Sequence, residues 1–371
     1  MSKQKKQNNG ERKPFALTRG MLGAFVFLFA GALAGAGAGT FAWFEIVSSA
    51  TVEQINIAME DISDFQIGVK GDDGEVHYYH SIDDAILAQH IASYSTEDAL
   101  DDMSSGVTAN WLTPSFDREA GFPSFYSHSN AHSHAPALQF ELYFRSTYAA
   151  YLYLDEEGTS IRALGSENAA IASQINDPTD PRHVAEYDVT AEDLNQVTKV
   201  IRVSMLSSVG YTIFAPDREE KAELAGPLDE NNDHYFDNKE GKEFVYGYYD
   251  GEPNYLPASA ESSEVQGRPT AFNSGHAAGV QPLDEDNPGY IPKLEESHTL
   301  EELKIPDGGA FDPTSLPFAV TKDNMEPTRV VLSIYAEGWD RLLTEAVSSG
   351  SFSLSLSFKG LMDPSASTYT R

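Results

Sequence analysis

The strongest signal in the chain is an alternation of apolar and polar residues, which is the period of a β-strand that buries one face. Four segments carry it most clearly, with apolar positions at Leu138, Phe140, Leu142 and Phe144; Ile201, Val203 and Met205; Val330, Leu332, Ile334 and Ala336; and Phe352, Leu354, Leu356 and Phe358. Serine fills the alternate positions of the last segment, which predicts an antiparallel strand with one solvent-exposed face. Weaker alternation predicts strands over residues 55–59, 65–69, 150–154 and 211–214.

Helical patterns are short by comparison. They cover Ala85–Tyr94, which Asp83 or Asp84 can cap, Glu167–Ile175 and Trp339–Val347. Strands and helices do not alternate along the chain, which argues against a parallel α/β sheet. The pattern therefore predicts an all-β fold, an antiparallel jelly-roll-like sandwich with short helices.

Between about residues 216 and 317 the alternation fades. The stretch is rich in Asp, Glu, Asn, Gly, Pro and Tyr, and its one apolar-aromatic run is Phe244–Tyr249. Because a structureless loop of this length is unusual inside a compact domain, we expect a long acidic, loop-rich insertion in the sandwich. A small second domain is the alternative interpretation.

The N-terminal residues have the order of an export signal. Six basic side chains precede the charge-free stretch Gly20–Phe44, whose apolar first half gives way to alternating Gly and Ala. This predicts a signal peptide over residues 1–42, cut by signal peptidase, and a mature domain over residues 43–371 outside the cytoplasm. Because the charge-free stretch is long enough to span a bilayer, a retained membrane anchor is the alternative. A type IV pilin leader fits Arg19-Gly20 but lacks the acidic residue expected soon after the cut.

Net charge and composition limit the classes of molecule that the protein can bind. The net charge of −32 becomes −37 without residues 1–42, which carry six basic side chains and one acidic one. So acidic a chain does not suit nucleic acid or anionic membrane surfaces, and contact with a membrane is expected only through the N-terminal segment. Cysteine is absent, which excludes disulfides and thiolate chemistry, so stability must come from a packed core.

One segment of the insertion has the ligand spacing of a calcium loop. Oxygen-bearing side chains fall at its positions 1, 3, 5, 9 and 12, which are Asp229, Asn231, Asp233, Asp237 and Glu240. His234 occupies the position where the sharp turn favours glycine, and neither flank predicts an EF-hand helix. The segment therefore predicts either a calcium site or a solvated acidic loop.

Other candidate chemistry is sparse. His128, His132 and His134 lie close together and could bind a transition metal, although a polar loop explains them equally. No catalytic motif of the metalloprotease, serine hydrolase, P-loop or dinucleotide-binding type is present. We therefore expect a protein without catalytic residues, and an extracytoplasmic hydrolase with scattered site residues is a minor alternative.

Four short motifs together resemble a known family. They are Gly39-Thr40-Phe41-Ala42-Trp43-Phe44; the strand Leu138–Arg145 followed by Tyr151-Leu152-Tyr153-Leu154-Asp155; Val200-Ile201-Arg202-Val203-Ser204-Met205; and Ile334-Tyr335-Ala336-Glu337-Gly338-Trp339-Asp340 before the serine-alternating strand. In these motifs the chain is similar to the exported surface proteins related to camelysin and TasA, the family of biofilm matrix fibres. The resemblance spans both ends of the mature chain but not the insertion.

The resemblance implies a jelly roll, cleavage after Ala42 and self-association into fibres. In fibres of that family the freed N-terminal segment of one subunit completes a sheet of its neighbour, and here that segment would be roughly Trp43–Ile57, with Trp43, Phe44 and Ile46 as apolar anchors. The resulting hypothesis is a non-enzymatic structural protein of the cell surface or extracellular matrix. The alternative is a secreted or membrane-tethered binding module that depends on calcium.

Overall fold

The computed structural model describes part of the chain in full and seven further strands by their backbone alone. The fully described residues are 65–91, 138–180, 183, 188–218, 296–307, 309, 311–338, 340, 342–343 and 347–362. The strands described by backbone are 51–59, 102–106, 110–117, 122–128, 242–244, 255–257 and 280–282. All of them lie in one compact unit, Ile46–Arg371, and the other unit is Met1–Glu45.

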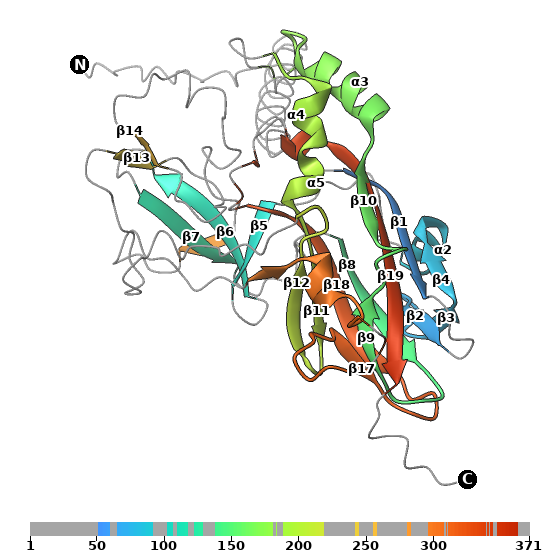
Figure 1. The fold of residues 1–371 in the computed structure, drawn as a ribbon. Coiled ribbons are helices and arrows are strands. Elements are labelled where there is room, and N and C mark those ends of the chain that lie inside the picture. Colours follow the sequence, from blue (N-terminus) through green and yellow to red (C-terminus); the bar gives the residue numbers. More distant parts are fainter. Residues whose placement is uncertain are drawn as a thin grey trace, which may run out of the picture. The chain divides into compact units, whose positions relative to one another are not determined.

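Two sheets dominate this unit (Figure 1). The first has the order β17-β9-β19-β1-β4, and β10 also pairs with β19. Its strands are β17 (Ala319–Thr321), β9 (Ala150–Leu154), β19 (Ser351–Met362), β1 (Thr51–Met59), β4 (Ser81–Asp83) and β10 (Ser160–Ala163). The C-terminal strand β19 is the centre of this sheet, because β1 pairs along one of its sides and β9 and β10 pair along it as well.

The second sheet has β18 at its centre, with β8, β11 and β5 as partners. From β18 it extends through β11, β12 and β16 in one direction, through β8, β2 and β3 in another, and through β5, β6, β7 and β15 in a third. These strands are β18 (Thr328–Glu337), β11 (Ile201–Ser207), β12 (Gly210–Phe214), β16 (Ser297–His298), β8 (Leu138–Arg145), β2 (Gln66–Lys70), β3 (Val76–Tyr79), β5 (Asp102–Gly106), β6 (Asn110–Asp117), β7 (Phe122–His128) and β15 (Val280–Pro282). A separate pair is formed by β13 (Lys242–Phe244) and β14 (Tyr255–Pro257).

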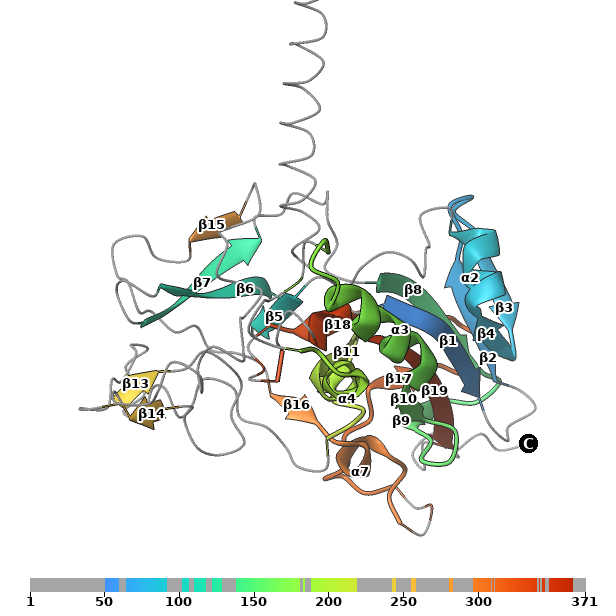
Figure 2. The same ribbon diagram turned by 90° about the horizontal axis from the view of Figure 1, so that it is seen from above.

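The helices are short, as the sequence predicts. In the described residues they are α2 (Asp84–His90), α3 (Gly165–Ile175), α4 (Ala191–Asn195), α5 (Val197–Val200) and α7 (Leu300–Leu303), together with a 3₁₀ turn at Val347–Ser349. Seen from above, α3 and α4 lie over one end of the strands (Figure 2). The Asp83 side chain caps α2 by accepting a hydrogen bond from the Ile86 N–H, which confirms the expected helix start.

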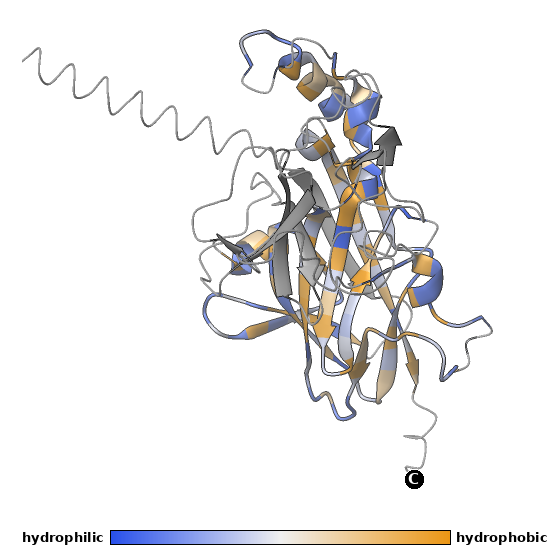
Figure 3. Cartoon of the chain, turned by 90° about the vertical axis from the view of Figure 1, so that its left-hand side faces the viewer, coloured by the Kyte–Doolittle hydropathy of each residue, from blue (hydrophilic) through white to orange (hydrophobic). Residues whose placement is uncertain are grey.

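The two sheets share one hydrophobic core. Phe144 of β8 meets Phe358 of β19 edge-on, with ring centroids 5.3 Å apart, and Phe318 packs 5.0 Å from Phe358. All three rings are buried, and burial of each contributes roughly 1.5–3 kcal/mol relative to an exposed ring. Apolar residues follow the strands and hydrophilic residues follow the turns (Figure 3). The all-β fold class predicted from the alternation is therefore confirmed.

Several sequence-based predictions about single elements need correction. Most strand pairs are antiparallel, but β1 with β19, β5 with β18 and β12 with β16 are parallel. Ser351 and Ser357 of β19 are buried rather than solvent-exposed, because other parts of the chain lie against them. Gly158 packs closely against the Ser357 side chain, and the Ser351 N–H donates a hydrogen bond to the Asn168 side-chain oxygen. Within residues 339–347 the structure describes no α-helix in the positions it covers.

Candidate functional site

The N-terminal strand β1 lies inside the first sheet, between the last strand of the chain and the short strand β4. Eight residues of β1 are in parallel register with β19, from Thr51 beside Ser351 to Met59 beside Phe358. On its other side, Asn56 to Ala58 pair with β4. The register shifts between Val52 and Gln54, so Glu53 has no register partner on β19.

The position of β1 in the first sheet determines how much of the N-terminal segment is available to pair with another subunit. The segment expected to add to a neighbour was roughly Trp43–Ile57, and its residues 51–57 belong to β1 of the chain's own sheet. In the parallel register, Ile55, Ile57 and Met59 stand beside positions of β19 whose side chains are buried in the core. The chain therefore leaves Trp43–Ala50 as the part that precedes its own sheet.

A buried ionic cluster joins β11 to the residues after β18. Asp340 accepts hydrogen bonds from Arg202 Nη2 at 3.0 Å and from Arg218 Nη2 at 2.5 Å. Arg202 also donates to the carbonyl oxygens of Lys199 and Ile201. Arg202 and Asp340 are both buried. Two of the motifs that carry the family resemblance thus meet in space, and what they form is an ionic cross-link rather than a nucleophile and a base.

A second acid holds the connection between β9 and β10. Asp155 is buried and its carboxylate lies 2.6 Å from Lys359 Nζ, while its other oxygen accepts the Gly158 N–H at 3.1 Å. Burial acts to raise the pKa of Asp155, but Lys359 and the backbone N–H groups outweigh it and the pKa is lowered. The carboxylate is thus kept ionised as a structural anchor.

The outer face of the second sheet has an ionic cluster around Glu141. Arg329, Lys70 and the Tyr143 hydroxyl all contact its carboxylate. The hydrogen bond from Arg329 is the main cause that lowers the pKa of Glu141 to about 2, with burial acting in the opposite direction. An acid this firmly ionised is a poor proton donor near neutral pH, so the cluster suits cross-strand pairing rather than acid catalysis.

Two histidines stack near the β2–β3 turn. The rings of His77 and His90 lie 3.9 Å apart at 16°, His77 Nε2 is 2.9 Å from Asp73 and His90 Nε2 is 2.6 Å from the Tyr79 hydroxyl. The backbone N–H of Glu75, followed by His77, lowers the pKa of Asp73. Stacked rings direct their nitrogens along parallel planes and not toward a common ion. Among the described residues, no group of three or more His, Asp or Glu side chains is placed to hold a metal.

Most residues singled out from the sequence lie outside the described part of the chain. This holds for the cleavage residue Ala42 and the anchors Trp43, Phe44 and Ile46, for the candidate calcium ligands Asp229, Asn231, Asp233, Asp237 and Glu240, and for His132 and His134. His128 ends β7, which is described by its backbone alone. The expectations for these residues remain predictions.

The buried ion pairs were not anticipated from the sequence. Arg202 occupies the polar side of an alternating strand, where an exposed residue is the usual expectation. The available signal was Asp340, an acid directly after the apolar strand that ends near Trp339, but nothing in the sequence links these two positions.

Comparison with known proteins gives no relative. No protein-family model matches the chain, and no curated protein and no solved structure is similar to it. Among the helices in the described residues, none has both the length and the apolar character needed to cross a membrane.

Proposed function

We propose that this chain is a non-enzymatic, exported structural protein of the cell surface or extracellular matrix. In this proposal it assembles into fibres when the segment Trp43–Ala50 of one copy adds to the sheets of another. We propose further that its two sheets form the jelly roll of the camelysin and TasA relatives that the sequence motifs resemble. The export signal and the missing catalytic motifs support the proposal.

The observation that carries the proposal is the place of β1. The strand begins at Thr51, beside the first residue of β19, and is held in its own sheet by β19 and β4. The segment Trp43–Ala50 directly precedes this fixed strand in the sequence, and an extended segment binds well to an exposed sheet edge or apolar surface. Trp43, Phe44 and Ile46 give this segment three apolar anchors.

Electron microscopy and sedimentation of the leader-free protein test the proposal. The protein that begins at Trp43 is expected to form fibres, whereas a truncated form that begins at Thr51 is expected to keep its fold and remain monomeric. A matched pair of variants of the protein that begins at Trp43 tests whether the apolar side chains, and not only the length of the segment, are needed. Replacing Trp43, Phe44 and Ile46 by serine should abolish fibres, and replacing Ser48 and Ser49 by alanine should not.

N-terminal sequencing of native material adds a second check, with Trp43 expected as the first residue. The proposal fails if the leader-free protein stays monomeric at every concentration. It also fails if the form that begins at Thr51 assembles as well as the longer form.

A further inference from the structure

Few large apolar side chains are strongly exposed in the described part of the chain. They are Tyr148, Leu206, Val209, Leu316 and Met362, with exposed fractions between 38% and 61%. Single exposed apolar residues are ordinary on a protein surface, but several gathered in one place indicate a contact site. We call these five residues the apolar end.

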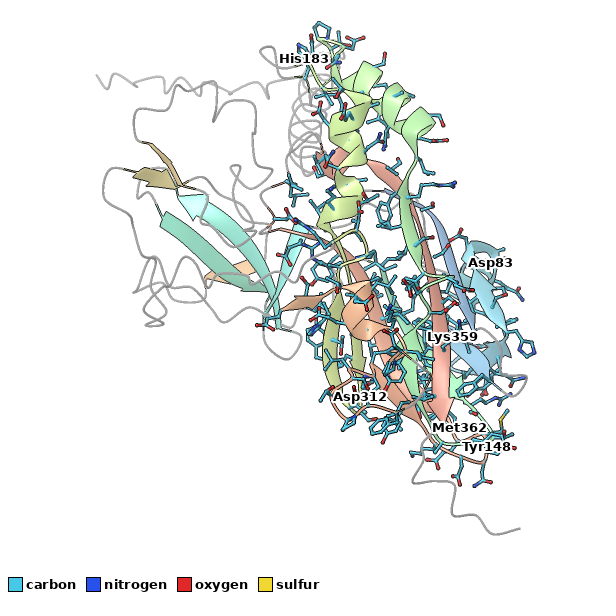
Figure 4. All side chains as sticks on the ribbon, in the orientation of Figure 1. Asp83, Tyr148, His183, Asp312, Lys359 and Met362 are labelled. Atoms are coloured by element: carbon cyan, nitrogen blue, oxygen red, sulfur yellow. The ribbon has the colours of Figure 1, made fainter. Side chains whose placement is uncertain are left out.

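The strand register places these residues at the same end of both sheets. Met362, the last residue of β19, pairs with Ala150, and Tyr148 precedes that residue by two. Thr321 of β17 donates its hydroxyl to the Tyr148 carbonyl at 3.4 Å. Figure 4 shows Tyr148 and Met362 next to each other, with His183 at the opposite end of the strands.

The remaining three members join the apolar end through β17. Leu206 and Val209 flank the turn between β11 and β12, and the Ser207 hydroxyl in this turn donates to the Phe318 carbonyl at 2.7 Å. Leu316 lies two residues before Phe318. The apolar end therefore consists of the β8–β9 turn, the β11–β12 turn, the residues just before β17 and the last residue of β19.

The N-terminal segment starts at the other end. Thr51 stands beside Ser351, the first residue of β19, and the Ser351 carbonyl accepts the Leu164 N–H just before α3. From Ser351 to Met362 the strand covers eleven steps, or about 36 Å. From Thr51 back to Trp43 the chain reaches at most about 29 Å when fully extended. The anchors of a copy therefore cannot reach Met362 at its own apolar end, and they can contact this surface only on another copy.

Charge agrees with this pairing of opposite ends. The only charged residue of Trp43–Ala50 is Glu45. Arg145, at the end of β8 three residues before Tyr148, lies over the Tyr78 ring at 3.4 Å and donates hydrogen bonds to Gln66. No carboxylate pairs with Arg145 among the described residues, which is unusual in a chain with a net charge of −32.

We infer that the apolar end is the receiving surface for the Trp43–Ala50 segment of a neighbouring copy. The inference rests on the proposed function and names its binding site. Trp43, Phe44 and Ile46 pack against Tyr148, Val209 and Met362, and Glu45 is drawn to Arg145. Because one end of each copy binds the opposite end of the next, the contact is heterologous and builds an open filament.

The test uses leader-free protein with one added charge at the apolar end. Val209→Asp and Met362→Asp are each compared with Ser160→Asp, which adds the same charge at an exposed position in β10, away from the apolar end. Two measurements are made on each, the lowest protein concentration that gives fibres and the anisotropy of a fluorescent peptide of residues 43–50. The first two variants should raise both the fibre threshold and the peptide Kd by about tenfold, and Ser160→Asp should change neither.

The two measurements separate this inference from the proposed function. If the parent protein forms fibres and binds the peptide, but Val209→Asp and Met362→Asp do both equally well, the receiving surface is elsewhere and the proposed function stands. If the parent forms no fibres but binds the peptide at the apolar end, the inference stands and the proposed function fails. Peptide binding that is absent from the parent, or indifferent to both substitutions, overturns the inference.

Discussion

The guanidinium group of Arg202 lies 3.0 Å from the carboxylate of Asp340, and both side chains are buried. The two residues lie 138 positions apart in the sequence, and Arg218 reaches the same carboxylate oxygen. Removing one member of a buried ion pair leaves its partner without compensation. This contact therefore adds a buried ionic link between β11 and the chain that leaves β18, beside the backbone pairing of the two strands.

Asp340→Ala is expected to lower the free energy of unfolding by roughly 3–5 kcal/mol, because two guanidinium groups lose their shared carboxylate. The control is Glu326→Ala, which removes an exposed pair with Lys322 and should cost less than about 1 kcal/mol. Urea unfolding of both variants measures the difference. Equal losses in the two variants would contradict the role assigned to Asp340.

Gly158 is expected to tolerate no side chain. A Cβ at this position would lie 2.4 Å from Ser357 Cβ, whereas a Cβ at Gly165, the first residue of α3, would meet nothing within 4 Å. Gly158→Ala should therefore destabilise the protein, while Gly165→Ala should be neutral or stabilise it by up to about 1 kcal/mol. Thermal unfolding compares the pair, and a Gly158→Ala protein as stable as the parent would show that the β9–β10 connection is not this close to β19.

The lowered pKa of Glu141 predicts how the stability of the protein changes at acidic pH. Its pKa falls from 4.5 to about 2 in the folded protein, so the folded state favours the charged form. The stabilisation is fully present above about pH 4.5 and is lost as the pH falls toward 2. Because the site is partly exposed, Glu141→Gln should cost about 1 kcal/mol at pH 7.

The variant Glu141→Gln should also lose part of the acid sensitivity of the parent. Its stability deficit is expected to shrink as the pH falls from 4.5 to 2, as measured by urea unfolding at a series of pH values. A deficit that stays constant over this range would mean that Glu141 titrates normally.

The candidate calcium loop makes a separate prediction. If Asp229, Asn231, Asp233, Asp237 and Glu240 bind calcium, the ion should raise the melting temperature and a chelator should reverse the effect. Asp233→Asn together with Glu240→Gln should remove the response, and Asp284→Asn, an acid elsewhere in the insertion, should preserve it. A melting temperature indifferent to calcium would leave the acidic loop without a metal.

The sequence predicted the elements whose pattern is local. Leu138–Arg145 and Ala150–Leu154 form strands with the predicted bounds. They could be predicted because the alternation of apolar and polar residues in a strand is visible within a few neighbouring residues. The parallel partnership of β1 and β19 could not be predicted, because strands at opposite ends of the chain carry no local sign of pairing. The buried Arg202 and Ser351 were missed for the same reason, since their partners Asp340 and Asn168 are distant in sequence.

The central claim is that the N-terminal segment of one copy binds the apolar end of another copy. The chain has no cysteine, so introduced cysteines can pair only with each other. Leader-free protein with Ile46→Cys is mixed with protein carrying Met362→Cys and oxidised under assembly conditions, and linked chains are identified by mass spectrometry. The account predicts a disulfide between the two different variants, and none within a dilute double variant, because residue 46 cannot reach residue 362 of its own chain. Absence of the mixed disulfide, or its closure within one dilute chain, would contradict the account.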